Sequence, residues 1–417
     1  MNFNELKTPV YVIDENKLRK NCLVLSDVMN KSGARILLAQ KAFSAYSTYP
    51  LIAEYLAGTT ASGLYEAKLA YEEFYTEKQK KLIGTSSKNE AAAKELFPEI
   101  HVFEPAFGDS EISEVCDIAD HIVFNSISQL EHHRKVWEKA IEIKGTIEKP
   151  LKRNGLSVGL RVNPEFSTQE GHDIYDPCAP GSRLGIRLCD FPEELPKGVE
   201  GLHFHTLCEQ GFEPLKETFE AFEKSFGKYL PKKGESGQIK WINMGGGHHI
   251  SKSDYDTKGL IELIKYIKNT YAVEVYLEPG EAIALDAGYL VTTVMDIVKT
   301  EKFPVLILDT SAACHMPDVL EMPYRPPLMD GFEIEEKTFK YRLSSRTCLA
   351  GDIIGDYSFD HEIRIGDRLI FEDMAIYSMV KNNTFNGMAL PDIAILHENG
   401  RTEVVKHFDY SDFKCRL

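Results

Sequence analysis

Short apolar runs alternate with helix-like segments between Ile36 and Pro279. The runs have the length and the aliphatic content of buried strands, and the segments between them carry apolar residues at helical spacing. This alternation predicts a parallel α/β fold, with a (β/α)8 TIM-type barrel as the leading candidate. The expected strands are 36–43, 58–62, 81–85, 100–104, 121–125, 157–162, 201–206, 240–244 and 273–277.

Nine runs are candidates for the eight strands of such a barrel, so either 81–85 or 100–104 is expected to be an insertion or no strand at all. Helices are expected after Ser62, with that residue as N-cap, and over 90–96. The charged stretch 142–154 lacks a clear apolar face and is expected to be a surface loop or a frayed connection.

The pattern changes after Gly280. Long helical periods become rare, and β-branched runs occur at 288–298, 305–309 and 368–371. We therefore expect two domains: a barrel over 30–282 and a mostly-β domain over 283–417, joined by an N-terminal strand at 8–13.

Composition narrows the range of partners. The chain has 417 residues, with 48 basic and 64 acidic side chains and a net charge of −16. This charge disfavours nucleic acid and anionic membranes as partners and is compatible with a small cationic substrate. Eight cysteines form no CxxC pair, so neither a zinc knuckle nor another metal site is expected. No apolar stretch is long enough to span a membrane and no secretory signal is visible, so a cytoplasmic location is expected.

Lys41 lies in the first apolar run, Ile36-Leu37-Leu38-Ala39-Gln40-Lys41-Ala42-Phe43. Burial disfavours the ammonium form, so the pKa of such a lysine should fall, and a neutral amine can form a Schiff base with an aldehyde cofactor. The alternative is a lysine at a strand end whose ammonium reaches solvent.

Other chemistry-bearing residues also follow expected strands. His203 and His205 share one face of the run 201–206, and Gly245–Gly247 could bring backbone N–H groups close to a phosphate. Glu278 begins the turn Glu278-Pro279-Gly280, where a carboxylate could pair with a protonated ring nitrogen. Each has an ordinary structural alternative, but together an amine, an imidazole, a glycine turn and a carboxylate indicate a pyridoxal phosphate site.

These residues, followed by Cys348, Asp352 and Tyr377, occur in the order that is typical of a known family. The chain resembles the fold-type III, alanine racemase-like pyridoxal phosphate decarboxylases, the group of ornithine and diaminopimelate decarboxylases. The stretches 38–43, 175–185, 202–210, 243–248 and 346–352 are similar to its carboxynorspermidine decarboxylase branch. The resemblance implies pyridoxal 5'-phosphate as cofactor and a homodimer with shared active sites.

The resemblance also implies a role for each matching position. Lys41 would bind the cofactor's aldehyde, His205 would stack on its ring, and Glu278 would face the ring nitrogen. Gly245, Gly246, Gly247 and Tyr377 would hold the phosphate. Cys348 would donate a proton after carbon dioxide leaves, entering from the partner subunit together with Asp352, which would contact the substrate.

Two departures from the ornithine and diaminopimelate enzymes support this branch. Glu281 stands where those enzymes usually have an arginine that helps to hold the phosphate, and Thr206-Leu207-Cys208 replaces the usual Gly-Ser pair after the histidine. The implied reaction is decarboxylation of carboxynorspermidine or carboxyspermidine in polyamine biosynthesis.

Specificity is the least determined part of the sequence. Glu321 is the candidate for binding the cationic tail, and Arg183 or Arg325 could instead bind a carboxylate. Diaminopimelate decarboxylase is therefore the enzymatic alternative. A pyridoxal phosphate-binding homeostasis protein is the alternative outside enzymes, although such proteins generally lack the C-terminal β domain.

Overall fold

The computed structural model describes residues 3–84, 98–146, 155–169 and 173–417. Two compact units make up the chain: Asn21–Ile283, and Met1–Lys20 together with Ala284–Leu417. The first contains a closed parallel barrel and the second a mostly antiparallel sheet, which confirms the expected fold class.

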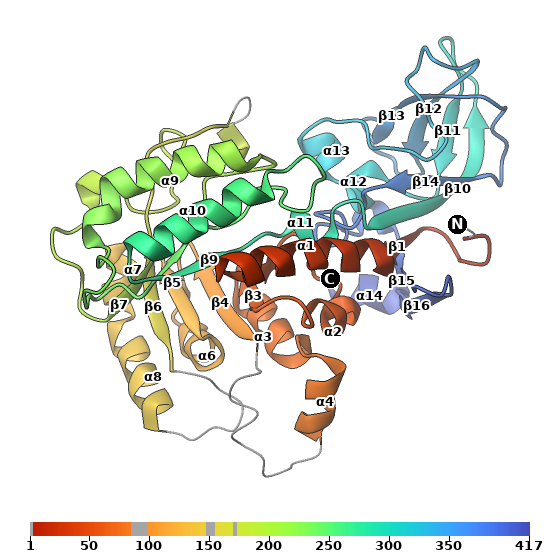
Figure 1. Cartoon of the computed structure of the whole chain (residues 1–417). Coiled ribbons are helices and arrows are strands. Elements are labelled where there is room, and N and C mark those ends of the chain that lie inside the picture. Colours follow the sequence, from red (N-terminus) through yellow and green to blue (C-terminus); the bar gives the residue numbers. More distant parts are fainter. Residues whose placement is uncertain (1–2, 85–97, 147–154, 170–172) are drawn as a thin grey trace. The chain divides into compact units, whose positions relative to one another are not determined.

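Eight parallel strands close the barrel in chain order, from β2 to β9 (Figure 1). They are β2 (Arg35–Ala39), β3 (Gly58–Ala61), β4 (Glu99–Glu104), β5 (His121–Phe124), β6 (Ser157–Arg161), β7 (Val199–His203), β8 (Trp241–Asn243) and β9 (Glu274–Leu277). The helices of this unit are α1 (Glu15–Ser32, which begins in the other unit), α2 (Tyr49–Ile52), α3 (Leu64–Glu73), α4 (Glu77–Gly84), α6 (Ile112–Ile118), α7 (Ile127–His132), α8 (Arg134–Thr146), α9 (Phe212–Phe226), α10 (Thr257–Thr270) and α11 (Glu281–Ala284, whose last residue belongs to the other unit).

The barrel's outer helices form where apolar residues recur at helical spacing. In α9 the buried side chains are Phe212, Leu215, Thr218, Phe219, Phe222 and Phe226, which all lie on one face. The neighbouring helix α10 buries Leu260, Ile264 and other aliphatic residues, and the Asp256 side chain caps it by accepting from the Gly259 N–H. Each helix therefore buries one apolar face. The two helices lie side by side (Figure 1).

The Trp241 indole fills the barrel interior because β6 and β7 carry glycines, Gly159 and Gly201, where the ring packs against them. A Cβ added to Gly201 would lie 2.0 Å from the indole, and one added to Gly159 would lie 2.3 Å from it. Leu37, Val123 and Tyr276 complete this interior cluster. The barrel is thus a packed core, and ligands can bind only at its ends.

The second unit is an eight-stranded sheet. Its strand order is β13-β12-β11-β10-β1-β15-β16, with β14 paired to β10. The expected strand 8–13 corresponds to β1, which runs antiparallel to β10 and parallel to β15. The elements are β1 (Val10–Asp14), β10 (Gly288–Val298), β11 (Val305–Leu308), β12 (Phe339–Ser345), β13 (Ile353–Phe359), β14 (Arg368–Glu372), β15 (Asp392–Leu396), β16 (Thr402–Lys406), α12 (Ala312–His315), α13 (Asp318–Glu321) and α14 (Tyr410–Cys415).

The structure decides between the two competing runs, and two other local expectations are wrong. The segment 81–84 is helical, at the end of α4, so 100–104 supplies the barrel strand; two adjacent apolar residues after a polar helix-forming stretch do not define a strand. Gly63, not Ser62, is the N-cap of α3, because the helix begins only at Leu64; the Ser62 N–H donates to the Glu66 carboxylate. The first part of 142–154 is helical, because α8 continues to Thr146. The expected helix 90–96 and the rest of 142–154 lie outside the described residues.

Candidate active site

Lys41 lies two residues beyond the end of β2, not within the strand as expected. The chain turns at this point, because the Ala42 N–H donates to the Ala39 carbonyl. The Lys41 side chain reaches solvent, yet protein surrounds it closely enough that lost hydration lowers the pKa of its amine, and repulsion from Arg161 lowers it further. Both properties suit a nucleophilic amine.

Glu278 follows β9 and is held by side chains of β8, the adjacent strand, and of β7, the strand beyond it. Asn243 Nδ2 donates to Oε1 at 2.6 Å, and His203 Nε2 lies 3.2 Å from Oε2. Burial alone would raise the pKa of Glu278, but its interactions with His203, His101 and Asn243 together outweigh burial and lower it to about 2. Burial lowers the pKa of His203, so a neutral imidazole donates to an ionised carboxylate. The barrel thus maintains a fixed negative charge near Lys41, whose pKa that charge raises in part.

The glycine turn after β8 packs against the turns on both sides of it. A Cβ on Gly246 would lie 2.1 Å from the Glu278 carbonyl oxygen, and one on Gly247 would lie 1.9 Å from that of Leu207. Gly245 and Gly247 also have positive φ angles of 67° and 81°. Only glycine satisfies both the contacts and the backbone conformation.

Two of the three glycine N–H groups already donate within the protein. The Gly245 N–H donates to Asn243 Oδ1 at 2.9 Å, and the Gly246 N–H donates to His205 Nδ1 at 3.1 Å. The second bond fixes the His205 ring as neutral, with its proton on Nε2, and burial lowers the pKa of this imidazole well below its ordinary value. The structure therefore brings Lys41, His205, Gly245–Gly247 and Glu278 together at the carboxyl ends of the strands, where TIM-barrel sites lie.

Arg161, at the end of β6, is a residue that sequence reasoning missed. Its guanidinium is buried, lies 4.6 Å from the Phe103 ring centre and donates to the His205 carbonyl at 3.0 Å. Burial lowers the pKa of Arg161 to about 10, so it remains a cation at neutral pH. A charged residue that ends a buried strand is the signal that could have identified it.

Glu281, the departure from the usual arginine, forms an ion pair with His249 at 2.5 Å. Burial opposes protonation of His249, but the hydrogen bond and charge of Glu281 outweigh it and raise the pKa of the imidazole. Near the glycine turn the chain therefore carries a histidine–glutamate pair.

In the sheet unit, Asp352 is 1% exposed and accepts from five donors. Its Oδ1 accepts from the N–H groups of Ala312 and Ala313, and its Oδ2 accepts from the hydroxyls of Ser311, Ser345 and Thr347. The carboxylate thereby fixes the segment that leads to Cys348 against the start of α12.

Cys348 and Tyr377 are the other predicted site residues of this unit. The Cys348 thiol is exposed, and the Cys348 N–H donates to Asn386 Oδ1 at 2.6 Å. Tyr377 is half-buried and has a positive φ of 53°, a conformation that is uncommon outside glycine. Their roles toward a cofactor stay predictions.

The candidate specificity residues already have partners or reach solvent. Glu321 is half exposed and forms an ion pair with Lys381 at 2.5 Å. Arg183 is exposed in the barrel unit. Arg325 pairs with Glu333 and lies 4.6 Å from the Tyr357 ring centre. The roles of Glu321 and Arg183 in binding substrate therefore remain predictions.

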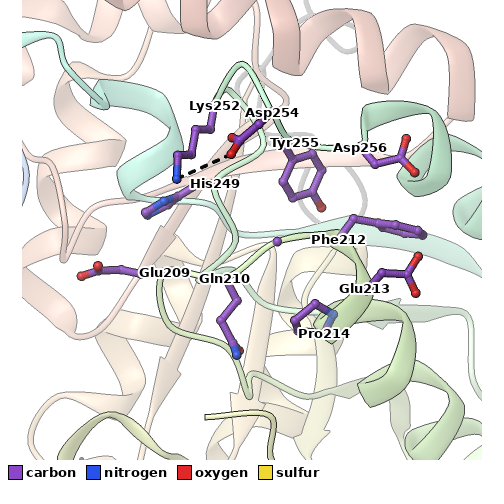
Figure 2. Close-up of a pocket in the computed structure, with 11 residues that line it drawn as sticks. Glu209, Gln210, Phe212, Glu213, Pro214, His249, Lys252, Asp254, Tyr255 and Asp256 are labelled. Carbon is purple, nitrogen blue, oxygen red and sulfur yellow. Dashed lines mark ion pairs between the residues drawn. The ribbon is translucent and has the colours of Figure 1, made fainter. Parts of the chain in front are cut away.

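A cavity of about 400 Å³ lies between the loops that follow β7 and β8 (Figure 2). Sequence reasoning did not identify it. Several of its charged side chains already have partners: Lys252 pairs with Asp254 at 4.0 Å, and Asp256 caps α10. His249 also lines it and pairs with Glu281. The lining does not include Gly245–Gly247, and the cavity assigns no ligand by itself.

Comparisons with known proteins identify the family of the chain. Residues 10–375 match the family described as "Pyridoxal-dependent decarboxylase, C-terminal sheet domain". The chain belongs to this family of pyridoxal-dependent decarboxylases.

No helix among the described residues has both the length and the apolar content needed to cross a membrane.

Relatives within the family are more specific. The chain is 40% identical, over the full length of both proteins, to the carboxynorspermidine/carboxyspermidine decarboxylase of Campylobacter jejuni. It is 36% identical to the carboxyaminopropylagmatine decarboxylase of Synechocystis, over 99% of this chain and 96% of the relative. A crystal structure of the Campylobacter jejuni carboxynorspermidine decarboxylase complexed with norspermidine has a TM-score of 0.83, 39% identity and coverage of 99% and 100% of the two chains.

Proposed function

We propose that this protein is a pyridoxal phosphate-dependent decarboxylase of carboxynorspermidine and carboxyspermidine, which forms norspermidine and spermidine. The observation that carries the proposal is the convergence of Lys41, Glu278 and the glycine turn at one end of a barrel whose full-length relatives include such decarboxylases. Diaminopimelate decarboxylases are more distant, at 22–24% identity over parts of the chain.

The residues present fit pyridoxal phosphate. The glycine turn has no room for side chains, Lys41 has a lowered pKa, and Glu278 stays ionised at neutral pH. Lys41 would hold the aldehyde carbon, Glu278 the ring nitrogen, and Gly247 with Tyr377 the phosphate. When bound, the cofactor supplies a protonated pyridine ring that accepts the electrons left as carbon dioxide departs.

The chain's own groups then have distinct tasks. Glu278 keeps a negative charge where a ring proton would sit, because Asn243 and His203 stabilise its ionised form. Neutral His205 offers its ring face while the Gly246 N–H and the Arg161 bond to its carbonyl fix its position. Cys348, exposed on a loop that Asp352 anchors, is the proposed proton donor to the carbon that loses its carboxylate.

The substrate test is a panel measured by released carbon dioxide. Purified protein is offered carboxynorspermidine, carboxyspermidine, carboxyaminopropylagmatine, diaminopimelate, ornithine and arginine. The proposal expects the highest kcat/KM on the first two. Highest activity on diaminopimelate, or on the agmatine derivative that the Synechocystis relative's name suggests, would refute the substrate assignment. No activity on any of them, with cofactor bound, would favour a homeostasis protein.

The cofactor test is independent of substrate. Borohydride reduction of the holoenzyme should attach the pyridoxyl mass to the peptide that contains Lys41, because its pKa is lowered while its amine remains reachable. Lys41→Arg should abolish both the adduct and the decarboxylation. An adduct on any other peptide would overturn the assignment of Lys41.

A homodimer with shared active sites is the remaining part of the proposal, and it rests on the family resemblance. Mixing inactive Lys41→Ala with inactive Cys348→Ala should restore activity in hybrid dimers, because one of their two sites would contain both residues. Failure to recover activity in dimers that have demonstrably exchanged subunits would rule out the shared site.

A further inference from the structure

Three potential metal ligands lie close together in the barrel unit, and the proposed reaction assigns no role to any of them. Asp109 lies in the turn before α6, His132 ends α7, and His133 follows directly. One carboxylate oxygen and one ring nitrogen from each histidine all lie within 4.8 Å of one another. No other group of this kind occurs among the described residues.

The spacing of these atoms suits a tetrahedral ion. Asp109 Oδ1 lies 2.7 Å from His132 Nε2 and 3.8 Å from His133 Nδ1. Ligands bound at about 2.0–2.1 Å in tetrahedral geometry stand roughly 3.3–3.4 Å apart, between these two distances. The Asp109 and His132 side chains are 81% and 58% exposed, so both can make the small rotation required.

His133 is already oriented as a ligand. It is 2% exposed, and its Nε2 lies 3.1 Å from the Phe107 carbonyl oxygen, which can only accept a hydrogen bond. Nε2 therefore carries the proton, and in the neutral ring Nδ1 is an acceptor. A carbonyl that fixes the tautomer in this way is the usual partner of a metal-bound histidine. The Phe107 N–H also donates to Gln129 Oε1 at 2.9 Å, so both polar groups of Phe107 bind the loop to the α7 segment.

This arrangement leaves two acceptors facing each other. A neutral His133 Nδ1 and the Asp109 carboxylate both present lone pairs across 3.8 Å, and the contact becomes favourable only when a cation lies between them. A proton on Nδ1 is one such cation, at the cost of burying an imidazolium. A metal ion satisfies both atoms and binds His132 as well.

We propose that Asp109, His132 and His133 form a binding site for a divalent transition-metal ion of the zinc class, with solvent completing its coordination. Two imidazoles and one carboxylate favour Zn²⁺, Co²⁺ or Ni²⁺ over Mg²⁺ and Ca²⁺, which prefer oxygen ligands. The ion would connect the loop after β4 to the end of α7. Because it would bind the folded chain and not the unfolded one, it would stabilise this side of the barrel.

Titration calorimetry with Zn²⁺ and Ni²⁺ tests the site on full-length holoenzyme that has been stripped with a chelator and alkylated at accessible thiols. We expect one ion per chain and a metal-dependent rise in Tm. His132→Gln and Asp109→Asn should each weaken binding by about tenfold or more. Both side chains are exposed, so without metal each variant should have the same Tm as the wild type.

His361→Gln is the matched control. His361 is also exposed and lies 2.7 Å from a neighbouring carboxylate, that of Asp360, but it belongs to no three-ligand group. This variant should bind metal like the wild type. Equal affinity in wild type, His132→Gln and Asp109→Asn, or no binding by the wild type at all, would overturn the proposal.

Discussion

Asp352→Asn distinguishes two roles for a buried carboxylate. Sequence resemblance predicts that Asp352 contacts substrate, whereas the structure surrounds it with five donors. Asparagine can keep one carbonyl oxygen for the N–H groups of Ala312 and Ala313. Its amide nitrogen, however, replaces the oxygen that accepts from three hydroxyls.

The cost follows from counting these partners. An amide nitrogen has two hydrogens, so even if the hydroxyls turn to accept, one of the three loses its partner. An unsatisfied buried polar group costs about 1–3 kcal/mol, and the lost carboxylate bonds were the stronger, charge-assisted kind. We therefore expect Asp352→Asn to destabilise the sheet unit by about 2–3 kcal/mol. For a domain of roughly 150–250 residues, this lowers Tm by about 4–12 °C.

Thermal unfolding at fixed protein and cofactor concentration measures this cost, and steady-state kinetics separates the two roles. If Asp352 anchors the Cys348 segment, Tm falls and kcat falls, while KM changes little. If Asp352→Asn instead leaves Tm within about 1 °C of the wild type and raises KM tenfold, the carboxylate faces substrate and the structural reasoning is refuted.

Three further changes test other parts of the site. Gly246→Ala should weaken cofactor binding and destabilise the barrel by about 1–3 kcal/mol, because the new Cβ would lie 2.1 Å from a backbone oxygen. Gly211→Ala is the control, because a Cβ there meets nothing within 4 Å. Absorbance titration measures cofactor binding and denaturation measures stability in both variants. Glu281→Gln should lower Tm most below about pH 6.5 and progressively less as the pH rises through the elevated pKa of His249. The reason is that the ion pair stabilises the fold only while the imidazole is protonated. A Tm difference between variant and wild type that grows with pH would contradict this. Glu321→Gln should raise KM for carboxynorspermidine by an amount equivalent to about 1–3 kcal/mol if Glu321 binds the tail, whereas an unchanged KM would identify a surface ion pair.

Most of the barrel could be predicted because its strands are short apolar runs that end in chemistry-bearing residues. Lys41, His205 and Glu278 could be proposed as site candidates because their types and positions after strands agree with one another; their roles stay predictions. The sequence could not decide between the runs 81–85 and 100–104, because an apolar pair such as Leu82 and Ile83 is equally common in helices and strands.

The contacts around these residues could not be predicted, because they depend on which strands become neighbours. Asn243 lies 35 positions before Glu278, yet β8 and β9 are adjacent, and its amide reaches the carboxylate. The same closure brings His203 to the other oxygen from β7. Sequence thus identifies the carboxylate, while only the order of strands in the closed barrel explains why it stays ionised.

Asp352 shows the limit of carrying a role over from matching positions. A carboxylate four residues after a reactive cysteine can either face a cationic substrate or organise the loop that presents the thiol, and the sequence of the loop is the same in both cases. The two roles differ in which hydrogen-bond donors surround the carboxylate. The donors to Asp352 come from α12 and its N-cap Ser311, from β12 and from the loop itself. A buried acid with all of its acceptor sites engaged has little capacity left for a ligand, because each new bond would have to replace an existing one. The cationic tail of the proposed substrate therefore calls for a carboxylate that keeps an accessible oxygen, and Glu321, half exposed with a single lysine partner, meets that requirement better than Asp352 does.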